Sequence, residues 1–242
     1  MILQACLNGA RPAGYHPALP LSLPAMVADA RAVVAAGANE LHIHPRDASG
    51  RESLHAVTPL MQALRPACPG TLIGVSTGAW IEADAAQTRT AIAGWQALPD
   101  YASVNLSEPD APAVIALLTE RCVGVEAGLA TPACAERLVT LPQAKTVFRI
   151  LIEVENQNIA QSEADMTGIL EVLAHARITR QILLHGFDST IWHFVSLAAQ
   201  RGFSTRIGLE DGRLLPDGSA APDNAAMIRA AQEVSLTGLG QL

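Results

Sequence analysis

Short apolar runs alternate with longer amphipathic runs along the whole chain, and this alternation constrains the fold more than any other feature. Brief hydrophobic runs bounded by turn residues predict buried strands, whereas apolar residues recurring every three to four positions predict helices. We expect eight strands, at 2–7, 40–44, 72–76, 102–105, 123–127, 147–153, 181–185 and 204–209. We expect eight helices, at 24–36, 58–64, 83–97, 111–121, 132–139, 163–175, 190–201 and 224–234.

Eight strand–helix units in 242 residues predict one α/β domain. Strands separated by helices are expected to be parallel and buried on both faces, which explains why these runs are almost continuously hydrophobic. No linker, low-complexity segment or change in composition divides residues 1–242. We therefore predict a single-domain (β/α)8 TIM barrel over 1–242, with a doubly wound open sheet as the alternative.

Composition and charge narrow the classes of partner. Half of the residues are hydrophobic, which is enough for a sizeable core, and the net charge is −7, so we expect no nucleic-acid partner. No apolar run reaches the roughly 18 residues that a membrane helix needs. The chain starts directly with the first predicted strand, without a basic signal sequence. Four scattered cysteines predict free, mostly buried thiols, and we expect a cytoplasmic protein that contacts no membrane.

Two histidines separated by one residue, His42 and His44, end the second predicted strand. Because side chains alternate across a strand, both imidazoles project to the same side. Active sites of TIM barrels lie at the carboxyl ends of the strands, where Glu210 follows the eighth strand. Two histidines and one glutamate with an open position form a catalytic zinc arrangement, so we predict a metal site here. The alternative is two core histidines that bond to the backbone.

Arg206 and Asp211 lie on either side of Glu210. We interpret them as an Arg–Asp pair beside the metal, with Asp211 as a general base that acts on a carbon acid. The alternative for Arg206 is a salt bridge at the barrel rim, and the alternative for Asp211 is a turn residue before Gly212.

Further polar groups at strand ends are candidates for substrate binding. Arg11 follows the first strand, and its guanidinium suits a substrate carboxylate, although a solvated loop arginine is the alternative. Hydroxyl and backbone N–H groups after the third strand can also serve a carboxylate. The candidates at the third and fourth strands are Ser76, Thr77, Gly78, Ser103 and Asn105.

Seven motifs follow one another in a specific order along the chain. They are Asn8-Gly9-Ala10, His16-Pro17, Ala36-Gly37-Ala38, His42-Ile43-His44 with Arg46, Val75-Ser76-Thr77-Gly78, Ser103-Val104-Asn105 and Arg206-Ile207-Gly208-Leu209-Glu210-Asp211. In this order they resemble the β-keto acid cleavage enzymes, the family that includes the 3-keto-5-aminohexanoate cleavage enzyme. The resemblance covers 2–231, essentially the whole chain.

The resemblance implies a zinc-dependent TIM barrel, usually a homotetramer, that converts a β-keto acid and acetyl-CoA into acetoacetate and a new acyl-CoA. It implies that Zn²⁺ is held by His42, His44 and Glu210. It implies that the Arg206–Asp211 dyad removes the C2 proton, and that the enolate then attacks acetyl-CoA before a retro-Claisen step. The carboxylate end would be held by Ser76 and its neighbours, with Ser103 and Asn105.

The chain departs from the family pattern at three places. Arg11 stands where the 3-keto-5-aminohexanoate enzyme has a glutamate suited to an ammonium group, so we predict an anionic or neutral substrate rather than an aminated one. The Gly-rich loop that the family places after the sixth strand is replaced by Glu153-Val154-Glu155-Asn156-Gln157-Asn158. Gly212 stands where an asparagine commonly follows the aspartate.

Two other functions remain open at this stage. Metal-dependent hydrolases of the amidohydrolase class also use His-x-His in a barrel, but they carry it on the first strand and need histidines near the fifth and sixth strands. Those two predicted strands contain no histidine here. The second alternative is a metal- or acyl-binding relative that kept the barrel and lost turnover, supported by the changed segment after the sixth strand.

Overall fold

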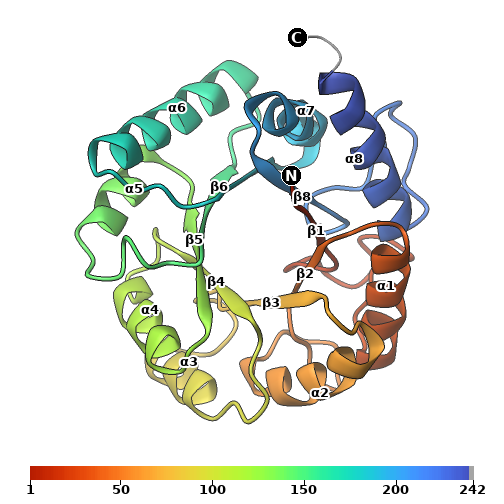
Figure 1. Ribbon diagram of the computed structural model, residues 1–242. Coiled ribbons are helices and arrows are strands. Elements are labelled where there is room, and N and C mark those ends of the chain that lie inside the picture. The colour runs from red at the N-terminus through yellow and green to blue at the C-terminus, as the bar shows by residue number, and fades with distance from the viewer. Residues whose placement is uncertain (240–242) are drawn as a thin grey trace.

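Eight parallel strands form a closed barrel in the computed structural model, which describes residues 1–239 (Figure 1). The strands are β1 (Leu3–Cys6), β2 (Glu40–Ile43), β3 (Leu72–Ser76), β4 (Tyr101–Asn105), β5 (Gly124–Leu129), β6 (Arg149–Val154), β7 (Ile182–Gly186) and β8 (Ser204–Ile207). Each strand pairs with the next, and β8 returns to pair with β1. The predicted (β/α)8 barrel is thus confirmed, and the open-sheet alternative is wrong because the sheet has no free edge.

Helices surround the barrel in the order in which they follow the strands (Figure 1). They are α1 (Leu23–Ala35), α2 (Val57–Ala67), α3 (Ala85–Ala93), α4 (Ala111–Glu120), α5 (Pro132–Val139), α6 (Ile159–His175), α7 (Ile191–Arg201) and α8 (Asn224–Leu239). Two short 3₁₀ helices, η1 (Leu54–Ala56) and η2 (Asp188–Thr190), precede α2 and α7. No helix in the described part of the chain is long and apolar enough to cross a membrane.

Capping residues define several helix ends. The Ser22 hydroxyl accepts a hydrogen bond from the backbone N–H of Ala25 at the start of α1. Gly202 ends α7 with a left-handed φ of 67°, a conformation that favours glycine. The predicted helix at 163–175 begins earlier, at Ile159, because the Asn158 side chain caps it by accepting from the N–H of Gln161.

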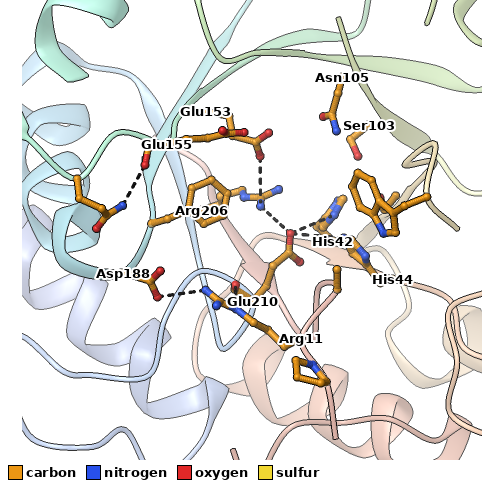
Figure 2. A pocket seen from close by; sticks show the side chains of 16 residues that line it. Arg11, His42, His44, Ser103, Asn105, Glu153, Glu155, Asp188, Arg206 and Glu210 are labelled. Atoms are coloured by element: carbon orange, nitrogen blue, oxygen red, sulfur yellow. Dashed lines mark hydrogen bonds and ion pairs between the residues drawn. The ribbon is translucent and has the colours of Figure 1, made fainter. Parts of the chain in front are cut away.

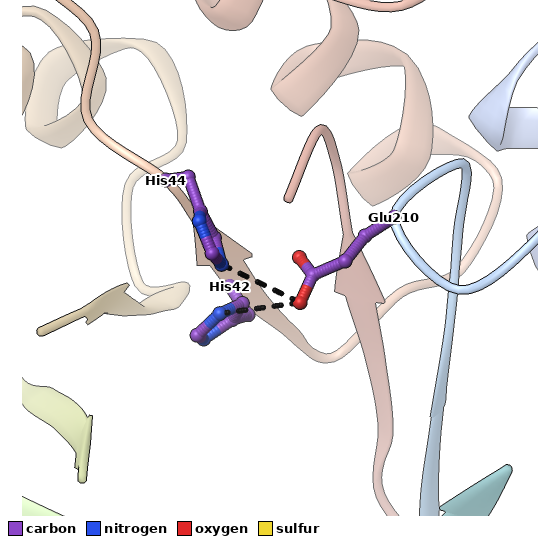
Figure 3. A group of neighbouring side chains, drawn as sticks. All are labelled: His42, His44 and Glu210. Carbon is purple, nitrogen blue, oxygen red and sulfur yellow. Dashed lines mark ion pairs between the residues drawn. The ribbon is translucent and has the colours of Figure 1, made fainter. Parts of the chain in front are cut away.

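The end of β8 differs from the prediction in a way that matters for the site. The predicted strand at 204–209 stops at Ile207, and the chain then turns, with the N–H of Asp211 donating to the carbonyl of Gly208 at 2.9 Å. A continued strand would pair these residues with a neighbour. The turn instead directs the Glu210 side chain towards β2 (Figure 3).

A charged network fills the barrel interior near the amino ends of the strands. Arg149 is fully buried between Glu40 and Glu126, and its Nε lies 2.9 Å from Glu126 Oε2. Tyr101 packs beside the guanidinium and donates its hydroxyl to the carbonyl of Leu41. The buried charges are therefore paired, as a dry interior requires. Glu126 belongs to this lower layer and does not line the pocket described below.

All four cysteines are free, and three of them are buried, as the sequence predicts. Cys6, Cys68 and Cys134 lie in the interior, whereas Cys122 is exposed. The thiols therefore act mainly as small apolar groups within the fold.

One buried amide ties the first and last helices to the barrel mouth. The Asn224 side chain, at the start of α8, donates to the carbonyl of Leu7 at 2.8 Å and accepts from the N–H of Leu209 at 2.7 Å. It also donates to Asp29 on α1 at 2.7 Å. Burial raises the pKa of Asp29 to about 7, with Asp223 adding to the rise and the bond from Asn224 opposing it. The fold thus favours the neutral form of this carboxyl.

We therefore predict that Asp29→Asn stabilises the protein at alkaline pH. Because the folded-state pKa lies above the unfolded value, the stability contributed by the neutral carboxyl is present below about pH 4 and is lost as pH rises through about 7. Thermal unfolding at pH 8 should give the variant a Tm about 2–4 °C higher, the shift that about 1 kcal/mol produces in a protein of this size. The difference should vanish below pH 4, and an equal difference at both pH values would contradict this assignment.

Candidate active site

Three buried side chains that can bind a metal meet at the carboxyl end of the barrel (Figure 3). His42 and His44 come from β2 and the residue just after it, and Glu210 comes from the turn after β8. Glu210 Oε1 lies 3.6 Å from His42 Nε2 and 3.5 Å from His44 Nε2. One ligand atom from each residue lies within 4.8 Å of the others. The three side chains that the sequence predicts as metal ligands therefore lie close together.

The donor set and its surroundings fit a divalent metal. His44 Nδ1 bonds to Glu52 Oε1 at 2.5 Å, which fixes the imidazole and leaves Nε2 facing Glu210. Two buried atoms of the group, His42 Nδ1 and Glu210 Oε2, have no hydrogen-bond partner within residues 1–239. Buried polar atoms without partners cost free energy, and a metal ion would satisfy the carboxylate here. A carboxylate behind a ligating histidine is also the usual support of a zinc site.

The electrostatics of the His42–His44–Glu210 group favour a positive charge beside Glu210. Burial lowers the pKa of His42 to about 3, so this imidazole is neutral. Burial also acts to lower the pKa of His44, but the charge of Glu210 and the bonds with Glu210 and Glu52 outweigh it and raise that pKa to about 9. Without a metal, a protonated His44 thus offsets the carboxylates, and a divalent cation is an alternative source of the same charge.

Arg206 holds three carboxylates together at the centre of the mouth, and Figure 2 shows two of them, Glu153 and Glu210. Its Nη2 lies 2.6 Å from Glu210 Oε1, 3.1 Å from Asp211 Oδ1 and 3.7 Å from Glu153 Oε2. The guanidinium is buried, and the surrounding negative groups outweigh burial and raise its pKa well above the ordinary value. The Arg206–Asp211 contact that the sequence predicts is therefore present, and it extends to Glu153 on β6.

Asp211 is enclosed, whereas Glu153 reaches the pocket. The Asp211 side chain is 1% exposed and does not line the pocket, and its Oδ1 lies 3.4 Å from His185 Nδ1. The other ring nitrogen of His185, Nε2, bonds to Glu153 Oε2 at 3.2 Å. His185 on β7 thus joins the two carboxylates, and only Glu153 lines the pocket.

The pocket has a volume of about 690 Å³ and opens at the barrel mouth (Figure 2). Its wall includes the three metal-binding candidates, Arg206 and Glu153. The other lining residues are Ala10, Arg11, Pro12, Ser76, Trp80, Ser103, Asn105, Glu155, Gln157, Phe187 and Asp188. Four predicted substrate-binding residues, Arg11, Ser76, Ser103 and Asn105, therefore share one cavity with the metal-binding group.

Thr77 and Gly78 lie outside the pocket wall and support residues in it. The Thr77 hydroxyl donates to the carbonyl of Ser103 at 2.7 Å, which links the ends of β3 and β4. The N–H of Gly78 donates to Ser76 Oγ at 3.3 Å. Both groups are thus engaged within the protein, and they place the two serines that face the cavity.

Most of the Arg11 donors are already used by the protein. Arg11 Nε donates to the carbonyl of Glu210 at 2.9 Å, and Nη2 contacts the carbonyl of Asp211 and Oδ1 of Asp188, both at 3.2 Å. The guanidinium also lies over the Tyr15 ring, 4.5 Å from its centre. Arg11 therefore lines the pocket and at the same time fastens the turn that carries Glu210.

Sequence reasoning missed two residues beside the metal-binding group. Glu52 lies in the loop after β2 and accepts from both His44 and the indole N–H of Trp80. Trp80 follows β3, is about half exposed, and stacks near His44 with ring centres 6.3 Å apart. Neither residue lies at a predicted strand end, so only a search for a carboxylate partner of His44 could have pointed to Glu52.

Fold and site together define a class: a (β/α)8 barrel with a buried His–His–Glu group in its carboxyl-terminal mouth. A family profile agrees with this class. The profile described as beta-keto acid cleavage enzyme matches residues 1–184 and 139–238. The chain therefore belongs to the β-keto acid cleavage enzyme family, which confirms the resemblance seen in the motifs. A comparison with curated proteins gave no match.

Solved structures of the same fold include ObcA. The ternary complex of ObcA with a C4-CoA adduct and oxalate has a TM-score of 0.72 at 17% identity, over 93% of the present chain and 65% of that chain. The binary complex of ObcA with oxaloacetate has a TM-score of 0.71 at 17% identity, over 93% of the present chain and 64% of that chain. The present chain thus spans somewhat less than two thirds of ObcA. Type I 3-dehydroquinate dehydratase from Clostridium difficile has a TM-score of 0.66 at 12% identity, over 100% of the present chain and 93% of that chain. At these identities the likeness shows the barrel fold.

We predict that Glu52→Gln weakens metal binding while leaving the three candidate ligands in place. The amide cannot supply the negative charge that supports His44, and loss of such a partner typically costs 10–100-fold in metal affinity. Calorimetric titration of the metal-free protein with Zn²⁺ should show this loss. Glu120→Gln, an exposed glutamate on α4, is the matched control and should bind like the wild type. Equal affinities for all three proteins would show that Glu52 does not support the site.

Proposed function

We propose that this protein cleaves a β-keto acid with acetyl-CoA as co-substrate, releasing acetoacetate and a new acyl-CoA. The observation that carries the proposal is the His42–His44–Glu210 group, which opens into a polar-lined pocket in a chain of the β-keto acid cleavage family. ObcA, of the same fold, is known in complex with a C4-CoA adduct and with oxaloacetate, a β-keto acid. A keto acid and a CoA thioester are therefore consistent with the pocket.

We assign Zn²⁺ to the group formed by His42, His44 and Glu210. Nitrogen and carboxylate ligands in this number suit zinc with an open coordination position. When bound, such a metal supplies Lewis acidity that makes the C2 hydrogens of a β-keto acid easier to remove. The chain contributes the rigid placement of the ligands, since Glu52 holds His44 and Arg206 holds Glu210.

The carboxylate end of the substrate is assigned to Ser76, Ser103 and Asn105, which line the wall formed by β3 and β4. Two hydroxyls and an amide can donate hydrogen bonds to a carboxylate. Thr77 and Gly78 support this wall through their bonds to Ser103 and Ser76.

Proton removal is assigned to the carboxylates around Arg206, of which the family resemblance points to Asp211. A carboxylate takes a C2 proton, the C–H bond breaks, and its electron pair forms the enolate. The enolate carbon attacks the acetyl carbonyl of acetyl-CoA, the thiolate leaves and adds to the original keto carbon, and the C2–C3 bond of the keto acid breaks. The proton then returns to C2 of the released acetoacetate, so the overall reaction consumes no proton. Burial acts to raise the pKa of Glu153 and Glu210, but the charge of Arg206 and the neighbouring histidines outweigh it and lower both pKa values.

The direct test is a search for new acyl-CoA species by mass spectrometry. The zinc-loaded protein is incubated with acetyl-CoA and a panel of cationic, neutral and anionic β-keto acids, alongside His42→Ala. We expect acetoacetate and one new acyl-CoA with the wild type, and loss of both products in the variant because a metal ligand is gone. A panel without product from zinc-loaded wild type would reject the proposed reaction, and would then favour a hydrolase or a non-catalytic metal- or acyl-binding relative.

We further propose that the substrate is anionic or neutral, because Arg11 lines the pocket and presents positive charge there. Arg11→Glu should shift the ratio of kcat/KM between cationic and anionic β-keto acids by about 10-fold or more towards the cationic ones, since like charges repel. The ratio is the relevant measurement because Arg11 also fastens the Glu210 turn, and its loss lowers turnover of every substrate. Arg11→Gln is the neutral control and should give an intermediate ratio. An unchanged ratio in both variants would remove Arg11 from substrate selection.

The homotetramer and the cytoplasmic location remain predictions from the family resemblance and the composition. Size-exclusion chromatography with light scattering tests the first of them directly.

A further inference from the structure

A second cavity, of about 530 Å³, lies at the barrel mouth beside the pocket. The segment after β1 contributes Tyr15 and Pro17 to its wall, and the segment after β8 contributes Arg213 and Leu214. The two segments lie together because β1 and β8 are paired in the closed barrel (Figure 1). Arg11 lines the pocket and lies over the Tyr15 ring, so this one contact joins the walls of the two spaces. We call the second space the Tyr15–Arg213 cavity.

Arg213 brings a positive charge to this cavity that no nearby carboxylate offsets. The side chain is exposed, and its guanidinium lies 5.8 Å from the centre of the Tyr15 ring. Within residues 1–239 this guanidinium makes no ion pair and no hydrogen bond, whereas the guanidinium of Arg11 on the same ring pairs with Asp188 at 3.2 Å. A free arginine fork is suited to a phosphate group, which it can bind through two parallel N–H donors.

The rest of the cavity wall is largely apolar. Pro17, Leu214 and Pro222 lie beside the Tyr15 ring, and Leu214 is about half exposed although it is a large apolar side chain. Nucleotide bases pack well against aromatic and apolar side chains, because every base has a flat face. An apolar wall next to an unpaired arginine therefore fits a nucleotide, which joins a flat ring to phosphate.

The side of the pocket formed by β6 is unsuited to phosphate. Glu153 and Glu155 both line the pocket there, and the whole segment 153–158 contains no lysine or arginine. This segment stands where the family pattern has a Gly-rich loop. Since like charges repel, a polyphosphate that approaches the mouth is disfavoured beside these two carboxylates and favoured beside Arg213.

We propose that the Tyr15–Arg213 cavity binds the phosphorylated adenosine end of acetyl-CoA. Arg213 pairs with a phosphate, the adenine packs against Leu214 and Pro222, and the flexible arm of the co-substrate passes Arg11 to place the thioester in the pocket. The proposal rests on the proposed function for the identity of the co-substrate. It adds the place at which this chain, without the Gly-rich loop, holds the nucleotide.

The first test compares two thioesters that differ in the nucleotide. Zinc-loaded protein is assayed with the β-keto acid that the panel identifies and with either acetyl-CoA or S-acetyl-N-acetylcysteamine, which carries the same thioester and no nucleotide. Arg213→Gln should raise the KM for acetyl-CoA about 10-fold or more, because a charge-assisted contact to phosphate is lost. The kcat, the KM for the keto acid and the kcat/KM for the truncated thioester should stay unchanged.

Two further variants make the result specific to the cavity. Leu214→Glu places a negative charge in the cavity at an exposed position, so it should fold and should also raise the KM for acetyl-CoA alone. Arg229→Gln removes an exposed arginine on α8 outside the cavity, and this matched control should behave like the wild type. Calorimetric titration with adenosine 3′,5′-bisphosphate measures the nucleotide contact without any reaction, and Arg213→Gln should weaken this binding by the same factor.

Each outcome decides the proposal. An unchanged KM for acetyl-CoA in Arg213→Gln, an equal loss with both thioesters, or no binding of the bisphosphate by the wild type overturns it. Binding of the bisphosphate and of CoA that depends on Arg213, without any new acyl-CoA in the complete assay, leaves the nucleotide site standing and rejects the proposed transfer to CoA.

Discussion

The barrel mouth depends on one buried guanidinium. Arg206 Nη2 lies within 4 Å of carboxylate oxygens from Glu210, Asp211 and Glu153. Carboxylates held this close together repel one another in a buried site, and the positive charge between them offsets that repulsion. The same contact fixes the carboxylate that faces the two histidines of the metal-binding group. Arg206 therefore links the candidate metal-binding group to the other carboxylates of the mouth.

A second buried arginine also pairs with carboxylates, one layer below in the barrel. Arg149 pairs with Glu40 and Glu126 near the amino ends of the strands, and the Tyr101 ring lies against its guanidinium. Gly74 on β3 leaves room for that ring, since a Cβ there would lie 2.0 Å from Tyr101. The interior of this barrel thus carries charged groups at both levels, but the lower network is enclosed and the upper one opens into the pocket.

Two of the segments that depart from the family pattern, Arg11 and the segment after β6, are linked through η2. Arg11 contacts Asp188 in η2, and the neighbouring Ser189 donates from both its N–H and its hydroxyl to Gln157 in the short β6–α6 connection. Glu153 is the next-to-last residue of β6, the strand that leads into this connection. These contacts link the segment after β1, η2 and the β6–α6 connection to one another beside the pocket.

The sequence by itself determined the barrel, its strand order and the identities of the metal-binding group, because these follow from local periodicity and from the rule that strand ends meet in the mouth. His42 and His44 share a face through strand alternation alone, and Glu210 follows from barrel closure.

Only the tertiary structure decided which carboxylates reach the pocket. Asp211 is enclosed and Glu153 is open because the turn after Ile207 and the packing of His185 between β6 and β8 set their directions, and neither contact leaves a periodic signal in the chain. The position of Glu52 and the contacts of Arg11 were likewise decided only by the tertiary structure. Long-range packing, rather than a local sequence pattern, brings loop residues to a site.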